Sequence, residues 1–315
     1  MPTLTQLEYL LAVNEERHFG RAAEKCFISQ PSLSAQIKKV EDELGIVIFD
    51  RSKKPIMVTL DGEQVLQQAL VVMKEHKKLF SVASNVGDEI RGHLELGIIP
   101  TLAPYLLPLF IKKFSHRFPK VHLKIKEYET ETLIKLLNQD NLDAALLVTP
   151  LGEEQIVERH LFFEPFFAYL PDNHKFLKKK TIDVKELKEE RLWLLDEGHC
   201  FREQMLKVCS FGKGHRALHN VEFSSGSLET LVGLVKGGDG YTLLPELATL
   251  RLDPKEIKNN LIPFKKPMPS REVSIVHSRL FLKEKIIEAL EETIIECLPK
   301  SLKSLKRGNV EVVNI

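Results

Sequence analysis

Two cysteines nine positions apart, Cys200 and Cys209, are the residues of this 315-residue chain best suited to redox chemistry. The segment that joins them has the pattern of a helix. Nine helical residues separate two Cα atoms by roughly 13–14 Å and, after a half-integral number of turns, put the side chains on opposite faces. A disulfide needs Cα atoms within about 7 Å. The thiols can therefore join only if the segment unfolds locally, as a redox switch would require.

The sequence around Cys200 favours it as the reactive thiol, and we expect it to be a partly exposed thiolate. Gly198 can break the preceding structure, which puts Cys200 near the start of the helix. There the positive end of the helix dipole and the free N–H groups favour a thiolate. His199 and Arg202 are close enough in sequence to add cationic or donor character. The other two cysteines, Cys26 and Cys297, lie in apolar segments and are interpreted as packing residues, the usual role of a lone cysteine.

Size and composition describe an ordinary globular chain with room for two or three domains. Hydrophobic residues make up 43% and charged residues 28%, and the net charge of +1 does not by itself indicate a nucleic-acid partner. No apolar run is long enough for a membrane span, and the N-terminus does not have the pattern of a signal peptide. We therefore expect no membrane association and a cytoplasmic location, where disulfides are more often transient than structural.

Residues 1–60 predict an all-α winged helix-turn-helix, a DNA-binding arrangement. Its third helix is expected to start at Ser29 or Gln30, with Pro31 in the first turn, and to end at Gly45. The polar face of this helix has no acidic residue before Glu41, and its hydroxyls and amides can bond base edges or phosphates. Alternatively, this polar face is simply exposed to solvent and does not contact DNA. The candidate DNA-contacting residues here are Gln30, Ser32, Ser34, Gln36 and Lys38.

Two short apolar runs, 46–49 and 56–59, predict the wing hairpin, and the basic segment between them contains Arg51. Residues 60–86 then predict one long linker helix. Its apolar positions form a stripe wide enough to contact both the first domain and a partner helix. We interpret residues 61–90 as a dimerisation helix with a hinge, in preference to a helix that packs only within its own chain.

The remaining sequence predicts an α/β regulatory domain of two lobes with a cleft for a small effector between them. Alternating strands and helices indicate one lobe from residues 91–163 and 268–300. Residues 164–267 form the second lobe, which contains Cys200 and Cys209. The expected strands are 94–99, 121–126, 144–148, 166–170, 192–195, 241–245 and 273–276. The tail, residues 301–315, is expected to fray.

Several runs resemble known regulators. Arg21-Ala22-Ala23, Ser29-Gln30-Pro31-Ser32-Leu33-Ser34 and Phe49-Asp50-Arg51 are similar to the N-terminal signature of LysR-type transcriptional regulators. Gly198-His199-Cys200 together with Cys209 resembles the hydrogen-peroxide-sensing members of that family. The resemblance implies a periplasmic-binding-protein-like regulatory domain, a homodimer or homotetramer, and double-stranded promoter DNA and RNA polymerase as partners.

The same resemblance assigns roles to single residues. Cys200 matches the peroxidatic cysteine and Cys209 the resolving one, and His199 matches the histidine beside the reactive thiol. The resemblance also places Thr101, Thr130 and Arg271 at the peroxide pocket, and Gln30, Ser32, Ser34 and Arg51 in the DNA-contacting parts. Glu203 stands where the relatives have aspartate, so a proton relay there would have a longer arm.

We therefore expect a peroxide-sensing regulator without a cofactor or metal, and not an enzyme. Three other functions are consistent with parts of the sequence. The cleft could bind an ordinary small organic effector, with the cysteines incidental. The thiol could serve a peroxidase. A metal could be held by the two cysteines of the segment and nearby histidines, although the spacing fits no standard zinc pattern; these residues are Cys200, Cys209, His199, His215 and His219.

Overall fold

The computed structural model describes residues 1–53, 55–84, 89–172, 174–187, 192–196, 198–209, 226–238, 240–278 and 283–314. The chain forms two compact units, Met1–Val86 and Gly87–Ile315. Among the described residues, no helix has the length and apolar character needed to cross a membrane.

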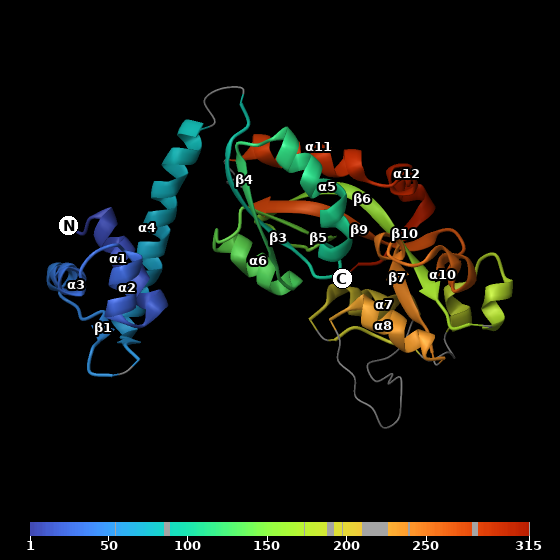
Figure 1. Ribbon diagram of the computed structural model, residues 1–315, viewed down its shortest axis with the longest axis horizontal. Coiled ribbons are helices and arrows are strands. Elements are labelled where there is room, and N and C mark those ends of the chain that lie inside the picture. Colours follow the sequence, from blue (N-terminus) through green and yellow to red (C-terminus); the bar gives the residue numbers. More distant parts are fainter. Residues whose placement is uncertain are drawn as a thin grey trace. The chain divides into compact units, whose positions relative to one another are not determined.

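The first unit is a winged helix-turn-helix followed by a long helix (Figure 1). The Ser29 hydroxyl caps its third helix by accepting the Ser32 N–H, and Gly45 ends that helix at a φ of +71°. Leu33, Ile37 and Val40 are buried, which leaves the predicted polar face outward. The helices are α1 (Leu4–Glu16), α2 (Phe19–Lys25), α3 (Gln30–Leu44) and α4 (Leu60–Ser84).

The predicted wing is a short antiparallel hairpin of β1 (Phe49–Asp50) and β2 (Met57–Val58), in which Phe49 pairs with Val58. Glu41 of α3 holds the base of this hairpin, because its buried carboxylate accepts the N–H groups of Ile48 and Phe49. The wing and α3 are therefore joined by one carboxylate.

The second unit is built on a mixed sheet of order β4-β3-β5-β9-β6-β7, with β10 paired to β9 and β8 to β6. The pairs β3–β4 and β3–β5 are parallel, whereas β9 is antiparallel to both β5 and β6. The strands are β3 (Gly92–Ile98), β4 (Val121–Glu127), β5 (Ala144–Thr149), β6 (Ile156–Tyr169), β7 (Thr242–Pro245), β8 (Leu261–Pro263), β9 (Met268–Ser278) and β10 (Val310–Val312).

Strand β6 connects the two halves of this sheet. Its residues from Ile156 to Pro165 pair with β9, and those from Phe166 to Tyr169 pair with β7 and β8. The predicted strand at 166–170 is thus the last part of a longer one. The helices of this unit are α5 (Ala103–Arg117), α6 (Thr130–Asn138), α7 (Cys200–Cys209), α8 (Leu228–Lys236), α9 (Glu246–Thr249), α10 (Pro254–Asn259), α11 (Glu284–Cys297) and α12 (Lys300–Lys303).

Two sequence-based expectations were wrong. The run 192–195 is not a strand; its one ladder contact is an isolated bridge from Leu192 to Tyr241. The tail does not fray, because residues 300–314 form α12, a 3₁₀ turn and β10. Leu302 and Val310 are buried, and β10 pairs in parallel with Met268–Ser270 of β9. The apolar side chains of the tail thus find a place on a sheet whose position the local sequence does not reveal.

Candidate functional site

Helix α7 begins at Cys200 and ends at Cys209, as predicted, and both cysteines are free thiols. Gly198, two residues before the helix, has a φ of +96°, a backbone conformation that favours glycine. Arg202 fixes this start, because its guanidinium donates a 2.6 Å hydrogen bond to the Leu195 carbonyl. The helix itself thus keeps the two sulfurs on opposite faces and roughly 10 Å or more apart, as about 1.5 Å of rise per residue requires.

The Cys200 side chain is 7% exposed, so the expectation of a partly exposed thiolate was wrong. Burial raises the pKa of the Cys200 thiol above its ordinary value. The Arg271 charge, the Thr130 hydroxyl and the backbone N–H groups at the start of α7 oppose this rise without cancelling it. A desolvated sulfur favours its neutral form. The resting side chain is therefore a thiol with groups around it that can stabilise a negative charge.

Arg271 of β9 organises the buried polar side chains near Cys200. Its guanidinium donates to the Thr101 hydroxyl at 3.0 Å and to the Thr101 carbonyl at 3.2 Å. Its Nε pairs with Glu164 at 2.8 Å, and the other oxygen of Glu164 accepts the Leu247 N–H. The guanidinium also lies 5.4 Å from the ring centre of Phe201, the residue after Cys200. Arg271 thus connects α7 with β6 and with the loop that contains Thr101.

Thr130 is the first residue of α6, and its side chain is 8% exposed. The hydroxyl is close enough to the Cys200 sulfur to lower the pKa of the thiol, yet no hydrogen bond of normal geometry reaches its oxygen from the described residues. A buried hydroxyl without a partner is energetically costly. The oxygen atom is therefore available to a small polar molecule beside the thiol.

Cys209, at the other end of α7, has an exposed fraction of zero and accepts a 3.2 Å hydrogen bond from the Tyr241 hydroxyl. Burial raises the pKa of this thiol to about 11, although the Tyr241 bond opposes the rise. The neutral, enclosed Cys209 is a poor nucleophile in this conformation, because the thiolate is the reactive form.

The structure brings Cys200, Thr101, Thr130 and Arg271 together, but it does not do so for every predicted residue. The ring of His199 is partly exposed and lies against Gly226, where a methyl group in place of the glycine hydrogen would be 3.1 Å from the His199 Nε2. Glu203 is exposed on the first turn of α7, so its carboxylate lies outside the buried group.

Sequence reasoning missed three residues that the site uses: Glu164, Tyr241 and Gln204. Glu164 could have been recognised from the sequence, because it interrupts the apolar run from Phe162 to Phe167. A carboxylate buried in such a run needs a charged or hydrogen-bonding partner. Gln204 is fully buried on α7, and its Oε1 has no hydrogen-bond partner among the described residues. No local pattern distinguished Gln204 or Tyr241 from other residues of a helix or strand.

The predicted DNA-contacting residues lie on α3 and the wing. Gln30, Ser32, Gln36 and Lys38 are exposed and Ser34 is partly exposed. Several already have partners in the chain: Lys38 pairs with Asp42 at 2.9 Å, and the Gln36 side-chain oxygen accepts from Gln6. Arg51 pairs with Glu41 at 2.8 Å and donates to Ser34 at 3.0 Å. Arg51 therefore ties the wing to α3 in addition to presenting charge.

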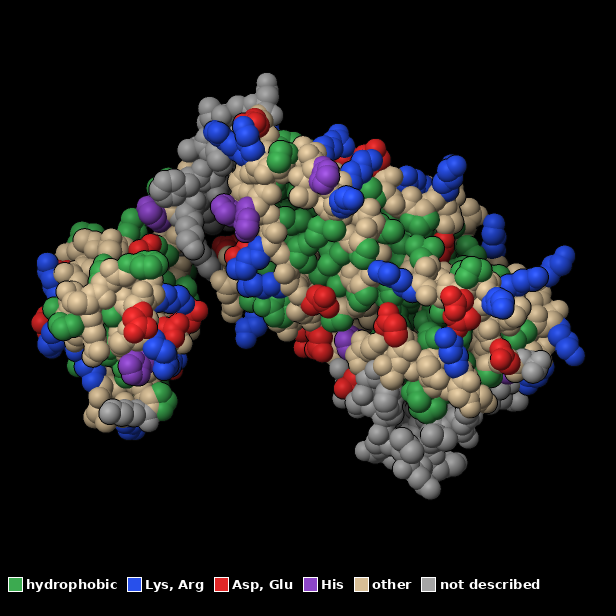
Figure 2. Space-filling model, in the orientation of Figure 1, with side chains coloured by type: hydrophobic (Ala, Val, Ile, Leu, Met, Phe, Trp, Pro, Cys, Tyr) green, Lys and Arg blue, Asp and Glu red, His purple; other side chains and the backbone are tan. Residues whose placement is uncertain are grey.

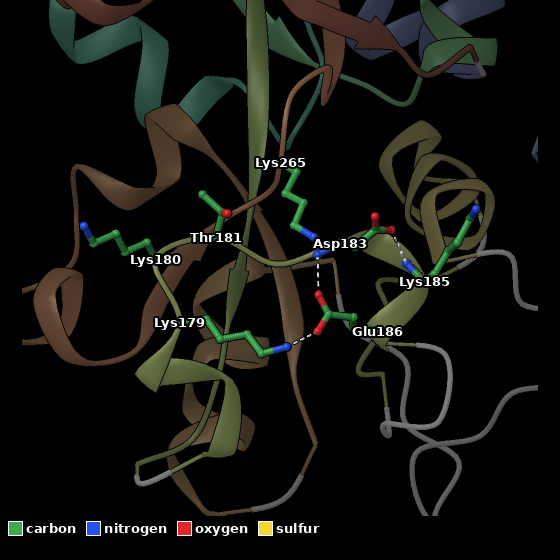
Figure 3. Close-up of a pocket in the computed structure, with 7 residues that line it drawn as sticks. All are labelled: Lys179, Lys180, Thr181, Asp183, Lys185, Glu186 and Lys265. Atoms are coloured by element: carbon green, nitrogen blue, oxygen red, sulfur yellow. Dashed lines mark hydrogen bonds and ion pairs between the residues drawn. The ribbon is translucent and has the colours of Figure 1, made fainter.

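A separate hollow lies in the second lobe (Figure 3), where lysines surround an acidic pair. Lys179 pairs with Glu186, and Lys185 donates its N–H to Asp183. None of the redox residues lines this hollow. Within the described residues, no three His, Cys, Asp or Glu side chains gather as a metal site would require; His215 and His219 lie outside the described residues.

The helix-turn-helix with its wing, the long helix and the two-lobed α/β unit define a one-component regulator: a DNA-binding domain joined to a sensing domain. Family models agree with this assignment. The bacterial regulatory helix-turn-helix protein model of the lysR family matches residues 4–63, and the LysR substrate binding domain model matches residues 87–297. The chain belongs to the LysR family of transcription regulators.

Within that family the chain is similar to OxyR proteins. The DNA-binding transcriptional dual regulator OxyR of Escherichia coli K12 is 38% identical over 277 residues, covering 87% of this chain and 88% of the relative. A hydrogen peroxide-inducible genes activator of Dickeya chrysanthemi is also 38% identical over 277 residues, covering 87% of this chain and 88% of the relative.

Solved OxyR structures have the same fold. A cysteine-to-aspartate variant of full-length OxyR from Pseudomonas aeruginosa gives a TM-score of 0.73 at 36% identity, covering 95% of this chain and 99% of that one. A hydrogen-peroxide-bound cysteine-to-serine variant of Corynebacterium glutamicum OxyR gives 0.63 at 29% identity, covering 94% and 92%.

Proposed function

We propose that this chain is a transcription regulator that senses hydrogen peroxide through Cys200 and stores the signal as a Cys200–Cys209 disulfide. One observation carries the proposal: the buried Cys200 thiol lies beside the Thr130 hydroxyl, whose oxygen makes no hydrogen bond of normal geometry with the described residues. A peroxide molecule is small, polar and able both to donate and to accept hydrogen bonds. Peroxide can therefore form a hydrogen bond with the Thr130 hydroxyl, which an apolar effector cannot do.

The first step oxidises the thiol. The Cys200 sulfur attacks one peroxide oxygen, the O–O bond breaks, and the thiol proton leaves with the other oxygen as water, so that a sulfenic acid forms. Thr130 and Thr101 orient the peroxide oxygens, and His199, at the rim, assists the departing oxygen. Arg271 stabilises negative charge as it develops on the sulfur. In the resting structure the Arg271 charge already lowers the pKa of the Cys200 thiol.

The second step forms the switch. The Cys209 sulfur attacks the sulfenic sulfur, an S–S bond forms and a second water leaves. A helix holds the two residues too far apart for this step, so α7 must unwind. Unwinding breaks the Tyr241–Cys209 hydrogen bond and frees the thiol. The helical and unwound forms of α7 are then the two states of the sensor.

The output is a change in promoter engagement. Helix α3 reads double-stranded DNA through residues such as Gln30 and Ser32, and Arg51 steadies the wing. Val72 and Leu79 of α4 are exposed, and Figure 2 shows hydrophobic side chains gathered on the regulatory unit where α5 lies. These surfaces support a homodimer, with the homotetramer and contact with RNA polymerase as further parts of the proposal. The site of action is the cytoplasm.

The test combines chemistry and DNA binding. Purified protein is treated with stoichiometric peroxide, its disulfides are mapped by mass spectrometry, and its selection from a random double-stranded DNA library is compared before and after. We expect one Cys200–Cys209 bond and a changed set of bound sequences, both absent in Cys200→Ser. Free thiols after treatment, in conditions that oxidise a known peroxide sensor, contradict the proposal. A response retained by Cys200→Ser would indicate a non-covalent effector.

A further inference from the structure

The C-terminal segment runs between the strand that contains Arg271 and the helix that contains both cysteines. Val310–Val312 pairs in parallel with Met268–Ser270 of β9, and the Val313 N–H extends the pairing by donating to the Ser270 carbonyl at 2.9 Å. This register ends one residue before Arg271. In Figure 1 the chain terminus lies in the regulatory unit.

The same segment contacts α7 from its other side. Gln204 donates its side-chain N–H to the Val313 carbonyl at 2.7 Å, and Lys207 reaches the Asn314 carbonyl at 3.2 Å. Gln204 is fully buried, which makes the loss of its partner costly. Both donors lie between the two cysteines in sequence, in the turns of helix that a disulfide must disrupt.

We propose that residues 310–314 act as a strap that holds α7 in its helical, reduced form. The strap would thereby shift the equilibrium between the two free thiols and the Cys200–Cys209 disulfide toward the free thiols. This inference rests on the proposed function and adds a regulatory element to it. The family model of the regulatory domain ends at residue 297, so the strap lies beyond the matched segment. Lys207 and the fully buried Gln204 are positioning residues in this scheme, because the strap acts on α7 through their side chains.

The direction of the effect follows from the contacts. The bonds from Gln204 and Lys207 require helical geometry between Cys200 and Cys209, so the strap stabilises the reduced state and not the disulfide state. Removing it should move the equilibrium of the dithiol with oxidised glutathione, which yields the protein disulfide and two molecules of reduced glutathione, toward the disulfide. Two or more net hydrogen bonds correspond to a shift of about tenfold or more.

The first test uses the full chain and needs no peroxide. In a Cys200→Ser background, alkylation of the buried Cys209 reports local opening of α7, because a thiol with no exposed surface reacts only from an open state. Mass spectrometry of the Cys209 peptide separates it from Cys26 and Cys297. We expect alkylation to become about tenfold faster when residues 310–315 are deleted. An unchanged rate overturns the strap whether or not the chain senses peroxide.

Two substitutions keep the test informative if the deletion fails to fold. Val313→Pro keeps the length of the chain and removes the N–H that bonds Ser270, so it should raise the rate by a smaller factor. Glu311→Gln changes an exposed side chain of β10 and serves as the matched control, with no change expected. Equal rates for the proline variant and the control contradict the proposal.

The second test measures the equilibrium between the dithiol and disulfide forms of the protein. Wild-type protein, the deletion and Val313→Pro are equilibrated in glutathione buffers, and the fraction of Cys200–Cys209 disulfide is determined. The proposal requires the half-oxidised point of the deletion variant to lie at an about tenfold higher value of the squared reduced-glutathione concentration divided by the oxidised-glutathione concentration, because two reduced molecules are released per disulfide. A shift the other way would mean that the strap favours the oxidised form, which refutes the proposal. Failure of any disulfide to form counts against the proposed function, whereas the alkylation test still decides the strap.

Discussion

Arg271 and Glu164 form an ion pair, 2.8 Å from Nε to Oε2, in which neither side chain is exposed to solvent. The pair explains how one arginine can hold a reactive site together without turning its cysteine into a permanent thiolate. Glu164 pairs with the guanidinium, and burial raises the Cys200 pKa more than the Arg271 charge lowers it. The site is therefore kept neutral until a substrate arrives.

Breaking this pair from one side should destabilise the regulatory unit. Arg271→Met leaves Glu164 charged and buried, and we expect a loss of about 3–5 kcal/mol in the free energy of unfolding, measured by urea denaturation. The double variant with Glu164→Leu should regain much of this loss. Lys124→Met removes the exposed pair with Glu95 and should have no measurable effect. A single variant as stable as the wild type would mean that the pair is not buried in solution.

The two threonines of the site should respond differently to the same change. Thr101→Val removes the acceptor of an Arg271 bond and should cost about 1.5–3 kcal/mol of stability. Thr130→Val removes a hydroxyl that makes no hydrogen bond of normal geometry with the described residues, so stability should hold, while the rate of oxidation by peroxide should fall about tenfold. Urea denaturation and stopped-flow peroxide kinetics separate the two effects. Equal rates for wild type and Thr130→Val would remove Thr130 from the proposed mechanism.

The pH dependence of stability should reveal the buried Cys209. Its folded pKa is about 11, whereas an ordinary thiol has the value 9.0. Between these values the unfolded chain has lost the proton that the folded chain keeps, so stability falls as pH rises. Relative to Cys209→Ala, the wild-type free energy of unfolding should drop by about 2 kcal/mol from pH 9 to 11. Parallel curves for the two proteins would show that the thiol is solvated.

Oxidation of Cys200 should also depend on pH in a characteristic way. Because burial raises the pKa of this thiol, its reaction with peroxide should reach half of its maximal rate at a higher pH than the reaction of an ordinary thiol does. In Glu164→Gln the arginine charge is no longer balanced, so the profile should move to lower pH. Rates of sulfenic acid formation in a Cys209→Ser background measure both profiles. A plateau below pH 8 in the parent would disprove the assignment.

DNA binding should separate specificity from general attraction. Lys38→Ala removes one candidate phosphate contact, so affinity should weaken for all sequences and the slope of log affinity against log salt should fall by about one. Gln30→Ala removes a side chain that can read a base edge, so the preferred sequence should broaden instead. Library selection with titration at several salt concentrations distinguishes them. Identical sequence preferences in Gln30→Ala and the wild type would exclude Gln30 from base reading.

Much of the architecture was readable in the linear order of residues. The caps at Ser29 and Gly45, the alternation of strands and helices from residue 92, and the helix between Cys200 and Cys209 all follow from local patterns. Periodicity and capping depend on neighbours within a few residues, so a single chain reveals them. The spacing of the two cysteines also implied their separation, because helical rise fixes distance along one element.

The character of the site was decided by contacts between distant segments. Arg271 meets Thr101 across 170 residues and Glu164 across 107, and these contacts hold a guanidinium near the buried Cys200 thiol. The C-terminal segment, whose composition predicted a frayed end, became a strand only because β9 offers it an edge and Gln204 a donor. Burial and pairing are properties of the whole packing, so no local pattern could report them.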